Sequence, residues 1–595
     1  MTAQTRTPIR HRIARLHLVM GILAVLLASL ASRLVVLATT DSSTLSATAD
    51  TRIIRTERID GRRGMIADRK GEPLAVSVNT FDLWVYKPNI EDVKSLSRSL
   101  ADALNLSASS IETLLSQPRP LYVSVARRVP LESYNVCRAV PSRAITLEPS
   151  FKRSHPYGPL ACHIVGFTDN DGRGLEGVEL LYNDELNPTP GQRRYLRDNL
   201  GRRISDPSSD SVIPSKDGQT IRLTINADIQ NIVEEELSRV IDAYDPSSAT
   251  AIVMDPYTAD ILAIANFPAF NPDDRNGTDI EQYRNRAITD QYEPGSTFKS
   301  FTLSLALDKG AITPDSPLIN LENGRWQVGQ RTLKDSHPPK EPFYPPWRVL
   351  AESSNIGASK IALMAYGGLT IRQLVNIRGE DRLERQLKRI MLSDSAWEYY
   401  ADLRAFGFGE PTGIDFPGES SGAVRAPQDW NRDSLMSIPM GQEIATTPIQ
   451  IIRGYSALIN GGRVLKPHIV LERRTETGDC LYQRKVEELS QPIRKETSDK
   501  IRTMLRQVVT ETQLKKIDDK ELQLAGKTGT AQIARNGHYE SGKYIGSFCG
   551  FAPYHEPKLI ALVVVREPDR KKGYYGSTVA APAVARILKR ALNAR

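Results

Sequence analysis

The sequence predicts an α/β (α+β) protein with three parts: one transmembrane helix, an extended α+β module, and an antiparallel sheet flanked by helices. Three observations predict this architecture. An apolar run near the N-terminus is long enough to cross a bilayer, short extended stretches dominate the region up to residue 215, and from Thr220 strands precede and follow a helical middle. At 595 residues the chain also needs more than one hydrophobic core.

The N-terminal segment predicts an uncleaved membrane anchor. Residues 1–17 carry four arginines and no acidic residue, and the run LVMGILAVLLASLASRLVVLA, residues 18–38, contains the single charge of Arg33. A signal peptide is the alternative, but its apolar region would be about 7–15 residues long and end at a cleavage site. Arg33 can extend toward the interface or pair with a partner helix. The positive-inside rule predicts a cytoplasmic tail at 1–17 and an external location after residue 38.

Net charge and cysteine content narrow the function only slightly. A net charge of +8 would suit nucleic acid, an anionic membrane surface or an anionic polymer, and an external location argues against nucleic acid. The four cysteines stand far apart and form no C-x-x-C pair, so they predict neither a zinc site nor a disulfide scaffold. Independent thiols are favoured, and one bridge between Cys137 and Cys162 stays open.

The order of elements predicts the sheet. Residues 39–215 form the irregular extended module, with stretches such as TFDLWVYKP, and VIPSKDGQT (212–220) is expected to be a linker. TIRLTI is a predicted strand and NADIQNIVEEELSRVIDAY a predicted helix, followed by a hairpin of SATAIVMDP and ADILAIANFP around Pro256 and Tyr257. SFCGFAPYHEPKLIALVVVREP supplies two more strands, and STVAAPAVARILKRAL a closing helix.

The stretch EPGSTFK contains a candidate nucleophile and base. Pro294 and Gly295 precede a helical run, so Ser296 is expected in the first helical turn, where backbone N–H groups favour developing negative charge. Lys299, three residues on, shares its helix face. Lysine can accept the serine proton only when burial or a neighbouring cation keeps it neutral. The alternative is a solvated helix face, although the chain has no other Ser-x-x-Lys.

Two further stretches hold complementary groups. AGKTGTAQI predicts a strand in which Lys527 and the flanking hydroxyls of Thr528 and Thr530 suit a carboxylate, while Gly529 allows close approach of a ligand or backbone. N–H groups of such a strand can also serve as oxyanion donors. In ESSNIGASK, Ser353 and Asn355 begin an apolar helix. Ser-x-Asn also occurs elsewhere in the chain, so this pattern is weak by itself.

The order Ser-x-x-Lys, Ser-x-Asn, Lys-Thr-Gly resembles the signature of the penicillin-binding and serine β-lactamase superfamily. RNRAITDQYEPGSTFK, FGFGEPTGIDFPGE and MGQEIATTPIQ resemble the transpeptidase domain of class B penicillin-binding proteins, and GRRGMIADRKGEPLA and GRGLEGVEL resemble the pedestal of that class. The C-terminal segment is most similar to the septal, FtsI-type enzyme of Gram-negative bacteria, with the elongation-specific relative as the nearest alternative. One departure is Ala259, where the family turns on glycine, so the hairpin geometry is in question.

The resemblance implies domains and roles. It implies a cytoplasmic tail at 1–17, a transmembrane helix at 18–38, a non-catalytic, dimerisation-like pedestal at 39–215 and a transpeptidase domain at 216–595, in the inner membrane at the septum. Ser296 would be the acyl-ester nucleophile, Lys299 the general base and Ser353 a proton relay. The remaining site residues would orient Lys299 or bind the substrate carboxylate: Asn355, Lys527, Thr528, Gly529 and Thr530.

The resemblance also implies partners. These are stem peptides ending in D-Ala-D-Ala, β-lactams bound covalently at Ser296, a lipid-II polymerase of the FtsW type and other division proteins, with no metal or organic cofactor and no nucleic acid. A hydrolase on the same fold, such as a D,D-carboxypeptidase or β-lactamase, an antibiotic-sensing receptor, and a division scaffold without activity are the alternatives. The long pedestal and the anchor argue against a secreted hydrolase, and the short tail leaves no room for a signalling domain.

Overall fold

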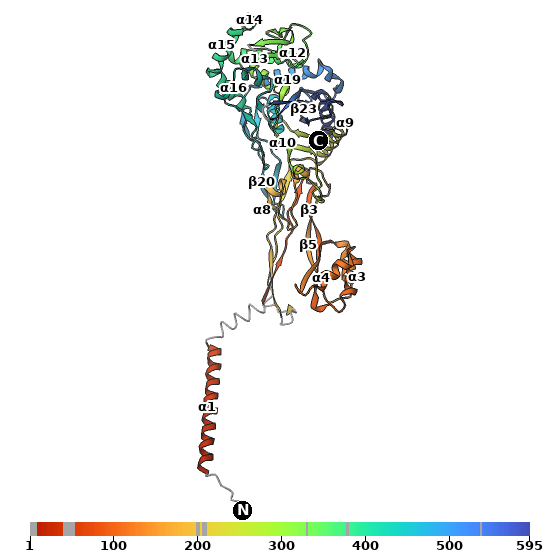
Figure 1. Cartoon of the computed structure of the whole chain (residues 1–595), viewed down its shortest axis with the longest axis vertical. Helices are drawn as coiled ribbons and strands as arrows, with labels where there is room; N and C mark the ends of the chain where they lie inside the picture. The colour runs from red at the N-terminus through yellow and green to blue at the C-terminus, as the bar shows by residue number, and fades with distance from the viewer. Residues whose placement is uncertain are drawn as a thin grey trace, which may run out of the picture. The chain divides into compact units, whose positions relative to one another are not determined.

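The structure is a computed structural model that describes residues 9–39, 54–197, 203–204, 211–328, 331–376, 380–535 and 538–594 (Figure 1). Its contacts divide the chain into two compact units. The first comprises Met1–Gly61 and Pro188–Lys216, and the second Arg62–Asn187 and Asp217–Arg595. The predicted domain boundary at residue 215 stays a prediction.

The first unit contains a long apolar helix and a small antiparallel sheet. Helix α1 (Ile9–Thr39) includes a span, Ile13–Thr39, with a mean hydropathy of 2.3, which fits a single-pass membrane anchor by length and composition. In the sheet, β6 (Gly191–Arg197) pairs with β1 (Ile54–Ile59), β7 (Arg203–Ile204) and β8 (Ser211–Ile213). Val212 and Ile213, expected to open a linker, lie in β8 instead, because their extended backbone pairs with β6. Residues 1–8 of the predicted tail lie outside the described residues.

The second unit begins with a seven-stranded sheet. Its order is β20 (Cys480–Gln483), β19 (Val470–Arg474), β9 (Thr220–Leu223), β2 (Ile66–Ala67), β3 (Pro73–Tyr86) and β4 (Tyr122–Pro130), and β5 (Ile145–Ser154) pairs with the other edge of β3. Side chains of α3 (Val93–Leu104), α4 (Ala108–Ser116) and α5 (Tyr134–Ala139) pack with Phe81, Leu83 and Val85 of β3 in a separate core. The predicted extended stretch TFDLWVYKP is confirmed in β3 up to Tyr86, and its last two residues begin a 3₁₀ turn, η1 (Lys87–Asn89).

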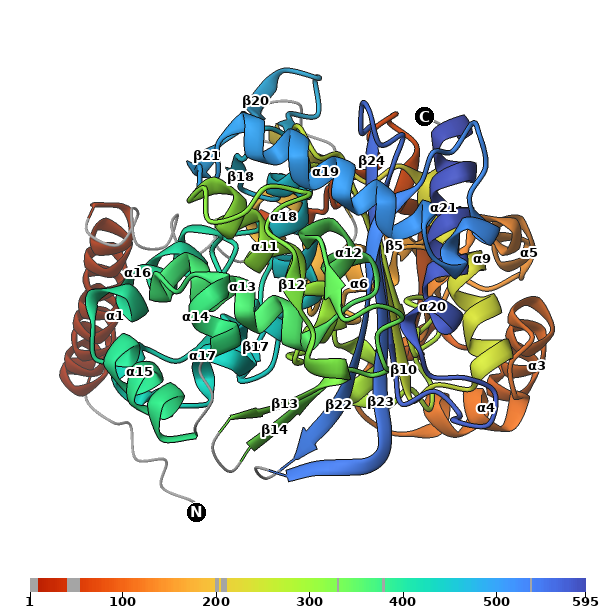
Figure 2. The same ribbon diagram turned by 90° about the horizontal axis from the view of Figure 1, so that it is seen from above.

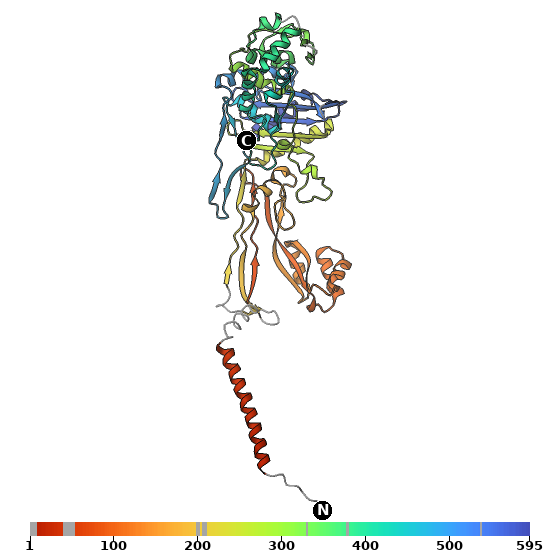
Figure 3. The same cartoon turned by 60° about the vertical axis from the view of Figure 1, so that its left-hand side comes forward.

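A five-stranded antiparallel sheet forms the centre of this unit. Its order is β11 (Ile261–Phe267), β10 (Ser248–Met254), β24 (Leu559–Arg566), β23 (His538–Ala552) and β22 (Ala525–Arg535). Figure 3 shows the yellow-green and blue strands, from distant parts of the sequence, in one sheet. Helices α9 (Ala227–Tyr244) and α21 (Ala581–Ala594) cover one face, and α18 (Pro448–Ile459) and α19 (Lys495–Thr510) cover the other (Figure 2). The predicted sheet with helices on both sides is confirmed.

Local signals explain two of these elements. Asn226 caps α9 by accepting the N–H groups of Asp228 and Ile229, as its position before the helical pattern indicates. The predicted hairpin of β10 and β11 is confirmed. In its turn Ala259 adopts a φ of +57° although it is not glycine, which costs roughly 1–2 kcal/mol. Its carbonyl accepts the N–H of His468, and its own N–H donates to the Asp255 carbonyl, so the surrounding structure holds the turn.

Helix α11 (Lys299–Asp308) is buried, and α12 (Pro346–Ala351), α13 (Asn355–Gly367), α18 and α19 pack against it. Further α-helices of this unit are α6 (Cys162–Val165), α7 (Gly177–Leu181), α8 (Asn183–Leu186), α10 (Arg286–Thr289), α14 (Ile371–Asn376), α15 (Glu380–Met391), α16 (Asp394–Ala405), α17 (Ser434–Ser437) and α20 (Gly576–Val579). Paired short strands are β12 (Ile319–Asn320) with β15 (Phe343–Tyr344), β13 (Arg325–Val328) with β14 (Arg331–Lys334), β16 (Ala423–Val424) with β17 (Ile444–Ala445), and β18 (Val464–Leu465) with β21 (Glu488–Ser490).

All four cysteines are free thiols. Cys137 is buried in the core under β3, whereas Cys162 begins α6, so the alternative of a bridge between them is wrong. Burial raises the pKa of the Cys162 thiol to about 12. This cysteine is therefore an unreactive packing residue at neutral pH.

Candidate active site

Ser296 lies in a tight turn that leads directly into α11. The predicted helical turn is a 3₁₀ turn, η4 (Gly295–Thr297), and α11 itself begins at Lys299. Gly295 has a φ of +54°, a conformation that favours glycine. Gly441 packs so closely on this turn that a Cβ atom on it would lie 2.2 Å from the Gly295 carbonyl oxygen. The backbone that carries Ser296 thus has a conformation that requires glycine and is packed closely against Gly441.

Lys299 is fully buried and lies at the centre of the site. Its Nζ atom is 3.0 Å from Ser296 Oγ, 2.6 Å from the Ser353 carbonyl oxygen, 2.7 Å from Asn355 Oδ1 and 3.2 Å from Ser353 Oγ. The two shortest contacts are to oxygens that only accept hydrogen bonds. A neutral amine has two N–H groups, so donation to these two oxygens directs its lone pair toward the hydroxyls.

Ser353 lies between two lysines. Its Oγ is 3.2 Å from Lys299 Nζ and 3.1 Å from Lys527 Nζ. The residue has a φ of +59° in the turn between α12 and α13. Such strain in a non-glycine residue persists only where neighbouring contacts hold it, and it gathers at functional sites.

Asn355 begins α13 and faces Lys299. Its Oδ1 contacts the lysine, and its Nδ2 donates to the Lys334 carbonyl at 2.8 Å, which fixes the orientation of the amide. Asp335 is not among the predicted site residues, and it accepts hydrogen bonds from the start of the same helix. Its only signal in the sequence is an acidic residue some distance before Ser-x-Asn, which is too common to be informative.

Strand β22 forms the opposite wall of the site. Lys527 is buried, and its Nζ contacts Ser353 Oγ and the Thr528 carbonyl, both at 3.1 Å. Thr528 and Thr530 line the cavity beside Ser296, and Thr530 Oγ1 accepts the N–H of Gly576 at 3.1 Å. The structure therefore brings all the predicted site residues together, from segments far apart in the sequence.

Gly529 allows β22 to pack against the Ser296 turn. A Cβ atom here would lie 2.5 Å from Ser547 Oγ and 2.9 Å from the Pro294 carbonyl oxygen. We therefore predict that Gly529→Ala separates β22 from η4 and lowers the rate of acylation by penicillin by roughly 10²-fold, the scale of a 1 Å misplacement. Stopped-flow acylation measures this. Gly542→Ala on β23 is the control for strain away from the site: its φ of +83° disfavours alanine, but only Arg570 Nη1 lies near, so the change does not displace β22 from η4. Wild-type acylation by Gly529→Ala would contradict the close-packing argument.

Burial and charge favour a neutral Lys299. Burial, together with the charge of Lys527, holds the pKa of Lys299 well below its usual value, while the Asp335 carboxylate acts in the opposite direction. Burial also lowers the pKa of Lys527 to about 7. Because both amines contact one hydroxyl, their titrations are linked. Of the two, Lys299 is the amine that stays neutral, since it is additionally repelled by a neighbouring cation.

A cavity of about 730 Å³ opens onto these groups. Ser296, Ser353, Thr528 and Thr530 line its floor, and its other walls come from the segment after β14, the end of α19 with the following turn, and the segment around α20. The volume suits a peptide-sized ligand. The arrangement of a serine beside a neutral amine, with a second lysine for an anionic group, supports acyl transfer.

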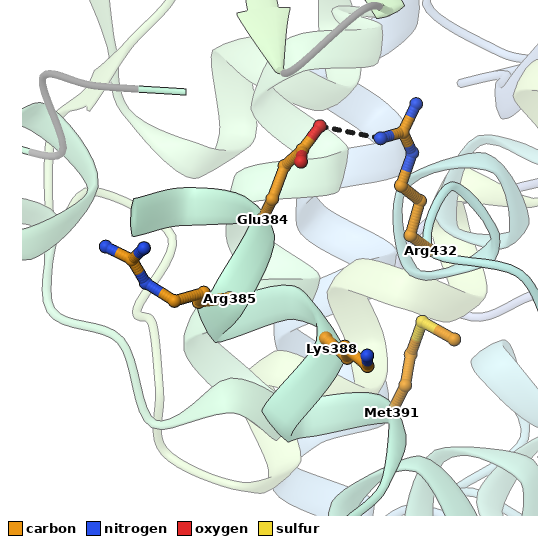
Figure 4. A pocket seen from close by; sticks show the side chains of 5 residues that line it. All are labelled: Glu384, Arg385, Lys388, Met391 and Arg432. Carbon is orange, nitrogen blue, oxygen red and sulfur yellow. Dashed lines mark hydrogen bonds and ion pairs between the residues drawn. The ribbon is translucent and has the colours of Figure 1, made fainter. Parts of the chain in front are cut away.

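A second pocket, of about 420 Å³, lies away from these residues (Figure 4). Glu384, Arg385, Lys388 and Met391 of α15 line it together with Arg432, and Glu384 forms an ion pair with Arg432 at 2.6 Å. None of these side chains pairs a nucleophile with a base. The chemistry therefore belongs to the larger cavity.

Comparison with known families and relatives agrees with this geometry. Residues 249–589 match the Penicillin binding protein transpeptidase domain, and residues 58–223 match the Penicillin-binding Protein dimerisation domain. "Probable peptidoglycan D,D-transpeptidase PenA" of Neisseria meningitidis is 28% identical over 97% of this chain and 92% of its own length. "Peptidoglycan D,D-transpeptidase FtsI" of Escherichia coli K12 is 29% identical, with coverage of 96% and 90%. "Probable peptidoglycan D,D-transpeptidase PbpC" of Pseudomonas aeruginosa is 30% identical, with coverage of 96% and 93%.

Solved structures share the fold. Penicillin Binding Protein 2X of Streptococcus thermophilus superposes with a TM-score of 0.70 at 21% identity and covers 91% of this chain and 80% of its own. Penicillin binding protein 3 of Mycobacterium tuberculosis, solved in complex with aztreonam, superposes with a TM-score of 0.65 at 23% identity and covers 90% and 97%. At these identities the likeness concerns the fold.

Proposed function

The chain belongs to the penicillin-binding protein transpeptidase family, and on this premise we propose that it is the septal, FtsI-type class B enzyme that cross-links peptidoglycan during cell division. It is a serine-type peptidoglycan D,D-transpeptidase with a penicillin-binding fold. The observation that carries the mechanism is the 3.0 Å contact between Ser296 Oγ and a buried Lys299 whose pKa is lowered.

Acylation begins with proton transfer from Ser296 to Lys299. The serine oxygen attacks the carbonyl carbon of the penultimate D-Ala of a stem peptide, and the neutral lysine takes the hydroxyl proton as the new bond forms. Backbone N–H groups of Ser296 and Thr530 hold the oxyanion. Loss of one such donor costs about 2.7–4 kcal/mol.

Ser353 then delivers a proton to the leaving group. Its hydroxyl contacts both lysines, so it can pass the proton held by Lys299 to the amine of the departing D-Ala while the amide bond breaks. The product is an ester between Ser296 and the donor peptide. The amine of a second stem peptide attacks this ester, gives up its proton along the reverse route and restores Ser296. Water in place of that amine would give carboxypeptidase activity as a side reaction.

Lys527, the second lysine of the site, has the role of binding the terminal carboxylate of the substrate. The terminal carboxylate binds beside Lys527, Thr528 and Thr530, and the close packing at Gly529 keeps this strand against the turn that carries Ser296. An anion at this place stabilises the charged form of Lys527, which burial alone disfavours. β-Lactams present a carbonyl and a carboxylate at a comparable spacing, so they acylate Ser296 in the same way.

The septal role rests on resemblance to relatives. The Escherichia coli relative is named FtsI, whereas others are named PenA, PbpC and, in Bacillus subtilis, stage V sporulation protein D. In our proposal α1 crosses the inner membrane with the N-terminus in the cytoplasm, and the rest of the chain works in the periplasm with an FtsW-type polymerase and other division proteins. An elongation-specific enzyme of the lateral wall is the second candidate, because the same domains and the same site would serve it.

Labelling of live cells with a fluorescent penicillin tests the proposal. Cells that express the chain should show a stable covalent label on it, concentrated at midcell during division. Label spread along the lateral wall would favour the elongation-specific enzyme. Rapid loss of label with release of hydrolysed penicillin would instead identify a hydrolase, because a transpeptidase keeps the acyl-enzyme until an amine resolves it.

A further inference from the structure

Asp335 forms a bridge between strand β14 and helix α13. Its Oδ1 accepts the backbone N–H groups of Asn355 at 2.6 Å and Ile356 at 3.1 Å, and its Oδ2 accepts the hydroxyl of Ser354 at 2.8 Å. Its own N–H donates to the Gly324 carbonyl at 3.1 Å, which ties it to the neighbouring 3₁₀ turn. Both oxygens of the carboxylate therefore face the start of one helix.

These contacts fix the position of the helix start. The first N–H groups of an α-helix have no partner within the helix, and they favour a negative charge. Asp335 takes two of them, and Ser354, held by Asp335, caps a third by accepting the N–H of Gly357 at 2.9 Å. The backbone from Ser353 onward cannot rotate or slide without breaking this set of hydrogen bonds.

The fixed helix start holds Lys299. Three of the four oxygens around Lys299 Nζ belong to Ser353 and Asn355. Asn355 Nδ2 also bonds to the carbonyl of Lys334, the residue before Asp335, so the same strand end orients the amide that faces the lysine. A displacement of the end of β14 would thus move most of the contacts that aim the amine at Ser296.

We propose that Asp335 is a positioning residue for the acyl transfer: its carboxylate orders the start of α13 and thereby holds Ser353 and Asn355 against the general base. The inference rests on the proposed roles of Ser296 and Lys299. Asp335 makes no contact with Ser296 and acts through the helix and through its charge.

Because Asp335 is charged, its substitution should also change the pH dependence of acylation, which the loss of a purely structural cap would not do. Charged groups reach Lys299 from two elements: Lys527 from β22, and Asp335 from the end of β14. The other groups that face it from η4 and α13 are uncharged hydroxyls, a carbonyl and an amide. Because Asp335 opposes the lowering of the Lys299 pKa, removal of its charge must lower that pKa further.

Three substitutions separate the effect of the Asp335 charge from the effect of its hydrogen bonds to the start of α13. Asp335→Asn keeps an oxygen for the two N–H groups and an NH₂ group for Ser354 Oγ, but it removes the charge. Asp335→Ala removes both. Ser354→Ala removes the hydrogen bond to Asp335 and the cap on the Gly357 N–H, but it leaves the carboxylate and its charge in place. The measurement is the second-order rate constant for acylation of the full-length protein by a fluorescent penicillin, from about pH 5 to about pH 10, corrected for the folded fraction.

We expect Asp335→Ala to lose about 10–100-fold in acylation across the whole range, because the lysine contacts shift. Asp335→Asn should keep the maximal acylation rate constant within about threefold of the wild type. The acid limb of its profile, in which the rate constant rises with pH, should lie at lower pH than in the wild type, because a less basic Lys299 is neutral at lower pH. Ser354→Ala should keep the wild-type acid limb.

Two results would overturn the inference. One is an unshifted acid limb in Asp335→Asn, which decides the matter even if Asp335→Ala does not fold. The other is a wild-type rate, after correction for folding, in Asp335→Ala. Labelling of a Ser296→Ala protein would instead refute the proposed function, since the nucleophile would lie elsewhere.

Discussion

Replacement of Ser296 by alanine is expected to abolish acylation by penicillin and release of D-Ala from a stem pentapeptide. No ester can form at an alanine, and neither Lys299 nor Ser353 is placed to substitute for the missing oxygen, since both are held by other contacts. Loss of a serine nucleophile costs on the order of 10⁶ in kcat in a serine hydrolase. Mass spectrometry of the penicillin-treated protein should find no adduct on the variant.

A second serine in the same cavity provides the control. Ser336 lines the cavity and is exposed, whereas Lys299 Nζ forms its hydroxyl contacts with Ser296 and Ser353. Ser336→Ala should acylate at the wild-type rate, and both variants should melt like the wild type, because neither fills nor empties the core. An adduct on Ser296→Ala, or loss of the adduct in Ser336→Ala, would move the nucleophile to another residue.

The sequence was sufficient to predict the catalytic half of the fold because its local patterns agree with its global structure. The buried strands β10 and β24 are short, largely continuous apolar runs, and helix α9 has a helical period after the cap Asn226. The sheet that joins β2 to β9 could not be predicted in this way. Strand β2 has two residues, too few to show a period, and its parallel pairing with β9 joins segments far apart in the chain.

The site residues likewise divide into those that a local sequence pattern predicts and those that it does not. Ser296, Lys299 and Lys527 could be predicted because acyl transfer requires those residue types in recognisable local spacings, and the structure brings them together. Asp335 could not, since its role depends on where the end of β14 meets α13, which no local spacing records. Ala259 shows the reverse case: propensity disfavours its φ of +57°, and tertiary hydrogen bonds impose it.

Lys299→Arg is expected to lower the rate of acylation by about 10²–10⁴-fold, the usual contribution of a general base. The guanidinium stays protonated at every pH of interest, so it cannot take the proton of Ser296. It is also planar and larger, in a place where the lysine is completely buried. Lys309→Arg is the matched control. Lys309 comes directly after the last residue of α11, is exposed and pairs with Glu398. It should acylate like the wild type.

The pH dependence of wild-type activity is a sharper test of the role of Lys299 as general base. A general base acts when neutral, so kcat/KM for D-Ala release should rise with pH through the pKa of Lys299, which burial and Lys527 place well below that of an ordinary lysine. Lys527 must be charged to attract the substrate carboxylate, and its pKa of about 7 in the free enzyme predicts a decline on the alkaline side. Because the titrations of the two amines are linked, the two apparent pKa values of this profile belong to the pair of lysines and not to either lysine alone. A wild-type limb near the usual lysine pKa of about 10 would contradict the lowered pKa of Lys299. Lys299→Arg should lose the acid limb, and an acid limb retained in this variant would show that another group removes the proton.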